Sequence, residues 1–329
     1  MSEIRARVIS QEKGLYTICY EGKENKAEVS GKFRYEAGTV SDFPTVGDYV
    51  VASWPEDGSH SIISSLFPRK SIFVRKAAGT DNKEQPVAAN IDTLFLCMSL
   101  NQDFNLRRLE RYLTISWDSG AVPIVVLTKA DLCDDLEQKM IEVSEVAAGV
   151  DIVIVSSKND DFEGVYEYLT PGKTVAFIGS SGVGKSTLIN KLLGEELFRT
   201  SEIREDDDKG RHTTTHRELV ALPNGAFVID TPGMRTLGLW NNEEGASVVF
   251  SDIEELACAC RFSNCSHTNE PGCAILEALA NGGLSEERWK SYQKLQIENA
   301  YTANESEYLK AKKEKFKAIA KMNKKRLGT

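Results

Sequence analysis

The stretch TVAFIGSSGVGKSTLINKLL, residues 174–193, decides the fold of the central part of this chain. An apolar run that predicts a buried strand leads into the turn GSSGVGKS, and the Leu- and Ile-rich segment after it predicts a helix. Glycines in the turn let backbone N–H groups approach phosphate oxygens, and the helix N-terminus adds the positive end of its dipole. In this strand–turn–helix context, the pattern G-x-x-x-x-G-K-[ST] predicts a phosphate-binding loop.

Two side chains of this loop have expected roles in holding a nucleotide. Lys185 is expected to reach the β- and γ-phosphates, and the Ser186 hydroxyl is expected to ligate Mg²⁺. The expected nucleotide-binding residues of the loop are Gly179, Ser180, Ser181, Gly182, Val183, Gly184, Lys185, Ser186 and Thr187.

The motif TKAD, at Thr128, Lys129, Ala130 and Asp131, ends another apolar run and predicts the base-binding side of the same site. The Asp131 carboxylate can accept hydrogen bonds from guanine N1–H and N2–H₂ and would oppose the adenine edge, which favours GTP over ATP. Lys129 is expected to pack along the base. Thr128 stands where this motif usually has Asn, so it keeps a hydroxyl, loses an amide and predicts weaker guanine binding.

The order of the motifs is the most specific feature of the chain. TKAD precedes the phosphate loop, and so does the weaker motif SSK at Ser156, Ser157 and Lys158, whereas DTPG, residues 230–233, follows the loop. An ordinary GTPase begins with the phosphate loop, so the parts of a GTPase are present here in rotated order. Asp230 is expected to hold Mg²⁺ through water, and the Gly233 N–H is expected to face the γ-phosphate.

A polar segment between the loop and DTPG, residues 204–219, predicts a switch that nucleotide and Mg²⁺ would order. One of Thr213, Thr214 and Thr215 is expected to ligate Mg²⁺, with Thr214 favoured. Met234 follows DTPG where Ras-like enzymes use Gln to orient the attacking water. His212 is the nearby side chain with suitable chemistry, against the alternative that it is an exposed loop histidine.

The segment CACRFSNCSHTNEPGC, residues 258–273, predicts a metal site. Cys260, Cys265, His267 and Cys273 follow the spacing C-x₄-C-x-H-x₅-C, and three thiolates with one imidazole suit a structural, tetrahedral Zn²⁺. Cys258 could replace Cys260 as a ligand, and unliganded cysteines are the remaining alternative.

The pattern of apolar, polar and turn-forming residues divides the chain into three expected domains. Residues 1–72 contain five short β-prone runs with Gly-containing turns and predict an OB-fold, with another small barrel or a sandwich as the alternative. Residues 73–240 alternate apolar strands and helices, as in a doubly wound α/β sheet. Residues 241–329 predict a helical, cysteine-containing domain in which Trp289, Tyr292, Leu295 and Tyr301 form a core stripe.

Composition sets the cellular context. The 329 residues carry a formal net charge of −9, yet nearly every charge in residues 310–326 is positive, which favours either RNA phosphate contacts or a solvated helix surface. No apolar run reaches the roughly 20 residues that a membrane span needs, and the N-terminus has no apolar signal core. With seven cysteines and no disulfide pattern, we expect a cytoplasmic protein with reduced thiols.

These motifs together resemble the circularly permuted GTPases of the ribosome small-subunit-dependent GTPase A (RsgA) family. The resemblance covers essentially the whole chain and includes VGDYV, LFPRKSIFVRK, AANIDTLFLCMSL, GRHTTT and CRFSNCSHTNEPGC. It implies a monomeric late assembly factor that binds the 30S subunit and its 16S rRNA, with GTP hydrolysis stimulated by the subunit. It also implies that the switch histidine of the family is His212.

Three rival functions stay open at this point. The first is a nucleotide-gated RNA-binding module or RNA chaperone in which hydrolysis only resets binding. The second is a P-loop ATPase or kinase, which TKAD disfavours. The third is a permuted GTPase of the large subunit, which the cysteine segment and N-terminal barrel disfavour by resemblance alone.

Overall fold

The computed structural model describes residues 2–12, 14–55, 57, 59–76, 84–101, 103–156, 158, 161–194, 218–230 and 243–303. The chain forms two compact units: residues 1–75 with 84–238, and residues 76–83 with 239–329. The first unit therefore contains the N-terminal barrel and the α/β sheet together.

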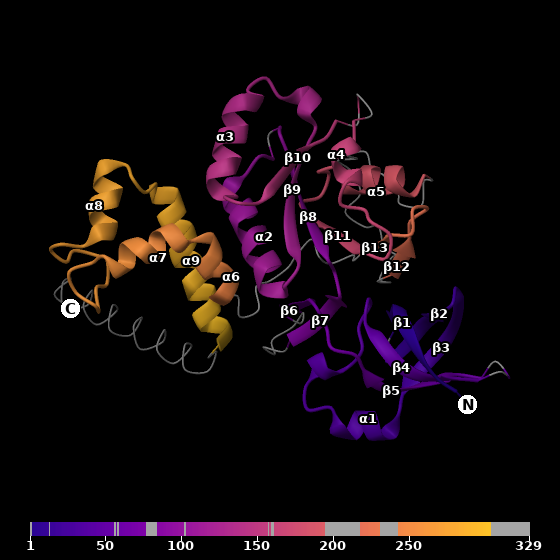
Figure 1. The fold of residues 1–329 in the computed structure, drawn as a ribbon. Helices are drawn as coiled ribbons and strands as arrows, with labels where there is room; N and C mark the ends of the chain where they lie inside the picture. Colours follow the sequence, from indigo (N-terminus) through magenta and orange to yellow (C-terminus); the bar gives the residue numbers. More distant parts are fainter. Residues whose placement is uncertain are drawn as a thin grey trace, which may run out of the picture. The chain divides into compact units, whose positions relative to one another are not determined.

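Five strands close the N-terminal barrel in the order β1-β2-β3-β5-β4-β1, which confirms the predicted OB-like fold (Figure 1). The strands are β1 (Ser2–Glu12), β2 (Leu15–Tyr20), β3 (Lys23–Val29), β4 (Tyr49–Trp54) and β5 (Ser61–Leu66), with helix α1 (Gly31–Glu36) and the 3₁₀ turn η1 (Val40–Asp42) between β3 and β4. Alternate apolar residues, among them Val8, Ile18 and Ile63, point inward and are fully buried. A two-stranded sheet of β6 (Ile72–Lys76) and β7 (Glu84–Ala89) follows the barrel.

The α/β part is built on a sheet in the order β10-β9-β8-β11-β13-β12. Its strands are β8 (Thr93–Ser99), β9 (Val122–Thr128), β10 (Asp151–Ile154), β11 (Thr174–Ile178), β12 (Glu218–Ala221) and β13 (Phe227–Asp230). All pairings from β10 to β13 are parallel, and only β12 is antiparallel to its neighbour. The continuous apolar runs of the sequence are these parallel strands, because strands covered on both faces need apolar residues on both.

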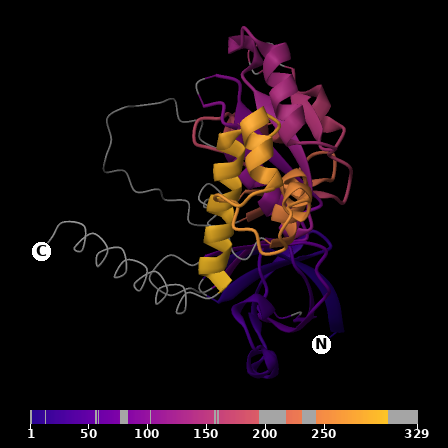
Figure 2. The same cartoon turned by 90° about the vertical axis from the view of Figure 1, so that its left-hand side faces the viewer.

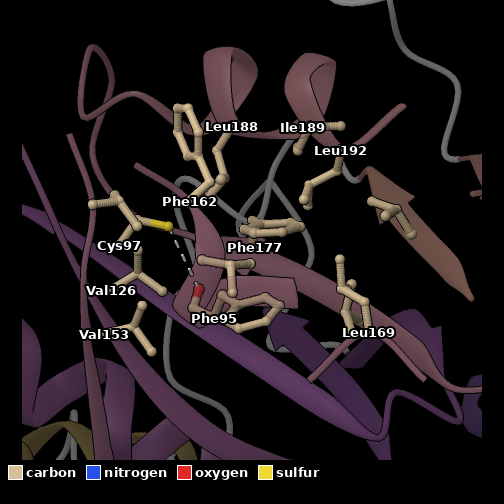
Figure 3. Close-up of a cluster of buried hydrophobic side chains, with 14 of the residues drawn as sticks. Phe95, Cys97, Val126, Val153, Phe162, Leu169, Phe177, Leu188, Ile189 and Leu192 are labelled. Atoms are coloured by element: carbon tan, nitrogen blue, oxygen red, sulfur yellow. Dashed lines mark hydrogen bonds between the residues drawn. The ribbon is translucent and has the colours of Figure 1, made fainter. Parts of the chain in front are cut away.

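Helices cover both faces of this sheet, with α2 and α3 on one face and α4 and α5 on the other (Figure 1). They are α2 (Leu106–Ser119), α3 (Leu136–Val146), α4 (Glu163–Tyr166) and α5 (Lys185–Leu193). Helix α2 ends at Gly120, which takes φ +82°, a left-handed conformation that glycine adopts without strain. Figure 3 shows Leu188, Ile189 and Leu192 of α5 packed over Phe95 and Phe177 of the sheet, whose rings stack at 4.8 Å.

The barrel joins the α/β sheet through one edge. Ser10 of β1 pairs with Glu218 of β12, so the two sheets are continuous. Beside this junction, the Arg7 guanidinium lies 4.7 Å from the Phe227 ring centre and donates a hydrogen bond to Thr174 Oγ1. Burial of Arg7 lowers the pKa of its guanidinium from the usual value, although the group stays charged at neutral pH.

The second unit is a group of four described helices, coloured orange to yellow in Figures 1 and 2. They are α6 (Glu243–Val249), α7 (Ser251–Cys258), α8 (Ala274–Asn281) and α9 (Glu286–Ala303). Trp289 and Tyr292 of α9 stack at 5.8 Å, Tyr292 contacts Phe250, and Leu295 is buried, which confirms the predicted packing role of these three α9 residues. Among the described residues, every helix is too short or too polar to span a bilayer.

Candidate nucleotide site and metal cluster

The phosphate loop lies where the sequence places it, between β11 and α5. Gly179 must be glycine, because a Cβ there would lie 2.5 Å from the Cys97 carbonyl oxygen on the neighbouring strand. Gly184 takes φ +104° immediately before the first residue of α5, and its carbonyl accepts the first helical hydrogen bond from Leu188 N at 3.0 Å. The loop is therefore fixed by close backbone packing at one end and by a left-handed glycine at the other.

The Lys185 ammonium is held at the mouth of the loop. Its Nζ donates to the carbonyl oxygens of Gly179 at 2.7 Å and Ser180 at 2.5 Å. Ser186 and Thr187 follow in the first turn of α5, the first half-buried and the second exposed. This turn presents its N-terminal end toward the loop, so the positive end of the helix dipole and the Lys185 charge act on the same small volume.

TKAD ends β9 and contacts the phosphate loop directly. The Thr128 hydroxyl is buried and donates to the Val183 carbonyl oxygen at 2.6 Å, which joins the base-binding motif to the loop. Lys129 takes the left-handed conformation at φ +59°, and Asp131 lies in the 3₁₀ turn η2 (Ala130–Leu132). The hydroxyl that Thr128 retains in place of an asparagine amide is thus engaged in a specific contact.

The SSK motif meets TKAD at the end of the next strand, β10. Ser156 Oγ donates to Asp131 Oδ1 at 2.8 Å, and Ser156 also pairs through its backbone with Asp161. Lys158 is exposed in the turn, and Ser157 lies outside the described residues. The Ser156 hydrogen bond orients the carboxylate that is expected to read guanine.

The switch residues are described only in part. Asp230 is the last residue of β13, which runs parallel to β11, so its backbone lies at the carboxyl edge of the sheet together with the loop. Four expected residues of the switches, His212, Thr214, Gly233 and Met234, lie outside the described residues, as do Thr213 and Thr215. Their predicted roles stay predictions.

Two residues that sequence reasoning missed, Asp103 and Arg108, contact the phosphate loop. Arg108 Nη1 donates to Asp103 Oδ1 at 2.7 Å and to Ser180 Oγ at 3.0 Å, and Ser180 Oγ donates to Asp103 Oδ2. Burial raises the pKa of Asp103, but the hydrogen bonds from Arg108 and Ser180 more than offset it, so the pKa lies below the usual value. The available signal was position: both residues follow the carboxyl end of the buried strand β8.

The cysteine segment forms a compact cluster in the second unit. One ligand atom from each of Cys260, Cys265, His267 and Cys273 lies within 4.8 Å of all the others. Cys260 Sγ is 3.5 Å from His267 Nδ1 and 3.9 Å from Cys273 Sγ. Zn–S bonds of about 2.3 Å and Zn–N bonds of about 2.0 Å place tetrahedral ligands roughly 3.5–3.8 Å apart, so this donor set fits zinc. Cys258 is exposed and is not part of the cluster.

Contacts around the cluster shape the turn that carries its ligands. The Glu270 carboxylate accepts hydrogen bonds from Ser266 N at 2.9 Å and Thr268 N at 3.0 Å, on either side of His267. Hydrogen bonds from the Ser266 hydroxyl and from these backbone groups hold the pKa of Glu270 well below its usual value. The His267 ring lies edge-on to Trp289 at 5.7 Å, so α9 supports the imidazole from the side.

A phosphate loop at the carboxyl edge of a parallel sheet, with the base motif supplied by a strand that precedes it in sequence, defines a circularly permuted P-loop GTPase. The sequence model of the RsgA GTPase family matches residues 66–240, and the chain belongs to this family.

Relatives and solved structures match nearly the whole chain. The small ribosomal subunit biogenesis GTPase RsgA 2 of Lactiplantibacillus plantarum is 48% identical over 94% of this chain and 88% of its own length. The crystal structure of YjeQ from Thermotoga maritima matches with a TM-score of 0.65 and 27% identity over 91% of this chain and 99% of that one. YloQ, a circularly permuted GTPase, matches with a TM-score of 0.62 and 27% identity over 91% of this chain and 96% of its own.

Proposed function

We propose that this protein hydrolyses GTP to GDP as a biogenesis factor of the small ribosomal subunit. The observation that carries the proposal is the Thr128–Val183 hydrogen bond, because it joins a guanine-reading motif and a phosphate loop into one site. The Lactiplantibacillus plantarum relative, which is 48% identical to this chain, is a small ribosomal subunit biogenesis GTPase, and this supports the proposal.

In the proposed reaction, a water molecule attacks the γ-phosphorus, and the bond from that phosphorus to the β–γ bridging oxygen breaks, which yields GDP and inorganic phosphate. Lys185 and the backbone N–H groups of the loop would hold the phosphates, while Asp131 would select guanine. Ser186 and Thr214, and Asp230 through water, would hold Mg²⁺, which when bound would supply positive charge that offsets the negative charge of the phosphates. The Gly233 N–H would face the γ-phosphate.

We propose that His212 orients the attacking water, because Met234 stands where Ras-like enzymes use Gln and His212 is the nearby side chain with suitable chemistry. We expect His212→Ala to lower kcat while GTP affinity stays near the wild-type value, as measured by GTP turnover and fluorescent-nucleotide binding. His216→Ala is the matched control, since it changes a second histidine of the same segment. An unchanged kcat for His212→Ala would remove this residue from the mechanism.

The proposed domains divide the work. Residues 1–72 would bind rRNA through the OB-like barrel, residues 73–240 would bind and hydrolyse the nucleotide, and residues 241–329 would carry a structural zinc and a basic tail. Cys260, Cys265, His267 and Cys273 would hold the zinc ion, with no open coordination position for catalysis. The partners are the 30S subunit and its 16S rRNA, and the protein would act as a cytoplasmic monomer.

GTP turnover with and without purified 30S subunits tests this function. We expect the subunits to raise turnover of GTP but not of ATP. ATP that displaced labelled GDP as effectively as GTP would contradict the guanine assignment, and turnover unaffected by the subunits would contradict the ribosomal one.

A further inference from the structure

The loop that follows β8 lies between the two halves of the nucleotide site. β8 is the strand between β9, which carries TKAD, and β11, which carries the phosphate loop. Leu100, at the start of this loop, donates its N–H to the Thr128 carbonyl oxygen at 2.9 Å, and Asp103 further along contacts Ser180. One short segment therefore touches both the base-binding motif and the phosphate loop.

Ser180 is the residue through which this segment reaches the phosphate-binding lysine. Its hydroxyl donates to Asp103 and accepts from Arg108, so one side chain is held from two directions. Its backbone carbonyl accepts from Lys185 Nζ at 2.5 Å. A chain of contacts thus runs from the Asp103–Arg108 pair through Ser180 to the Lys185 ammonium.

The negative charge of Asp103 explains why it is paired with Arg108. An unpaired carboxylate beside a loop that binds phosphate would repel the ligand, and the Asp103 side chain is only partly exposed, at 36% of its surface. Arg108 lies 2.7 Å away at Nη1 and cancels this charge while its own hydrogen bond to Ser180 holds the loop. The Asp103 carboxylate can then position Ser180 without weakening anion binding.

We propose that Asp103 and Arg108 are positioning residues for the nucleotide phosphates: they fix Ser180, and with it the carbonyl that holds Lys185, and Arg108 keeps the Asp103 charge from opposing the phosphates. This inference rests on the proposed nucleotide-binding function. It assigns neither residue a contact with the nucleotide itself.

The test compares GDP with GMP as competitors of fluorescently labelled GDP, using the full chain. The ratio of the GMP dissociation constant to the GDP dissociation constant reports how well the loop holds the β-phosphate. We expect Arg108→Ala to lower this ratio at least about tenfold, which corresponds to 1.4 kcal/mol, and more strongly at low salt because screening is weaker there. Adding Asp103→Asn to Arg108→Ala should recover roughly threefold of the loss by removing the repelling charge.

Three further variants complete the design. Arg108→Lys, which keeps the charge, should retain a higher ratio than Arg108→Ala. Arg288→Ala, which breaks an Arg–Asp pair of the same 2.7 Å length in the C-terminal helices, should leave the ratio unchanged. Ser180→Ala removes the shared hydroxyl with no change in charge and should lower the ratio about threefold, a measurement that stands even if Arg108→Ala fails to fold.

An Arg108→Ala ratio within twofold of the wild-type value, or a double variant no better than Arg108→Ala alone, would overturn the inference. Both results would leave the proposed GTPase function intact. A wild-type protein that bound GMP as tightly as GDP, or ADP as tightly as GDP, would instead overturn the proposed function and this inference with it.

Discussion

The nucleotide site and the Cys/His cluster differ in what holds them together. The nucleotide site joins residues far apart in sequence, such as Thr128 with Val183 and Asp103 with Ser180, and buried parallel strands bring them together. The cluster uses ligands from residues 260–273 only, three of the four half-buried. A site built on a packed sheet keeps its geometry without its ligand, whereas a short segment of loop depends on its metal.

The largest expected effect is that of zinc removal, which should change the structure of the cluster but hardly change GDP binding. Removing zinc with a chelator, or replacing Cys265 with Ser, should release the fixed geometry of residues 260–273, because structural zinc contributes about 10–16 kcal/mol to small domains at neutral pH. GDP affinity should change less than about twofold, since the described contacts of the phosphate loop come from its own sheet and helices. Zinc content, hydrogen exchange across the segment and GDP binding measure the outcome.

Cys258→Ser provides the control for the zinc experiment, because Cys258 lies outside the cluster and should leave the zinc content unchanged. A tenfold loss of GDP affinity on zinc removal would show that the two sites are energetically coupled, so that the nucleotide site does not keep its geometry independently of the cluster.

The second prediction changes the nucleotide site and measures whether the metal cluster responds. Lys185→Ala should weaken GDP and GTP binding roughly a hundredfold, since truncating one partner of a close charge pair costs about 2–5 kcal/mol. Zinc content should stay at the wild-type level. Lys191→Ala, in the last turn of the same helix, is the control and should bind nucleotide normally. Equal nucleotide affinity for both variants would contradict the placement of Lys185 at the phosphates.

The difference between the sites also explains how much of each could be predicted from sequence. The predicted zinc ligands are local, so spacing alone selected the four residues that the structure clusters. The strands of the α/β sheet were recognisable because β8 and β9 are uninterrupted apolar runs. The phosphate loop and TKAD were recognisable because each is a contiguous motif.

What the sequence did not reveal depends on contacts between distant residues. The pairing of Ser10 with Glu218 joins the barrel to the α/β sheet, yet the sequence assigned Glu218 and Leu219 to a polar switch segment and predicted no strand there; the structure corrects this with β12. Asp103 and Arg108 resemble ordinary solvated charges, and only the fold places them against Ser180. The role of the Thr128 hydroxyl was likewise invisible until Val183 was seen beside it.

A matched pair of glycine substitutions, one in each site, compares the rigidity of the phosphate loop with that of the cysteine segment. Gly179→Ala should destabilise the protein by about 1–3 kcal/mol and weaken GDP binding, because the added Cβ would meet the Cys97 carbonyl, a backbone atom of a buried strand. Gly272→Ala should cost about 1–2 kcal/mol, from its φ of +75° and a 3.1 Å approach to the Arg261 Cβ, and should leave GDP binding unchanged because Gly272 lies in the cysteine segment. Thermal unfolding and GDP binding measure both, and equal effects on GDP affinity would contradict the contrast.

The smallest expected effect concerns the hydrogen bond that joins the two halves of the nucleotide site. Thr128→Val keeps the shape of the side chain but leaves the buried Val183 carbonyl without this donor, so GDP affinity should fall roughly fivefold, or about 1 kcal/mol. Thr128→Ser keeps the hydroxyl and should stay within about twofold of wild type. Thr128→Asn tests the expectation that the missing amide weakens guanine binding. If Thr128→Asn binds GDP more tightly, the amide adds a contact that threonine lacks. If it binds equally well, the hydroxyl already supplies the link between base motif and loop, and the substitution of Thr for Asn is neutral for guanine binding.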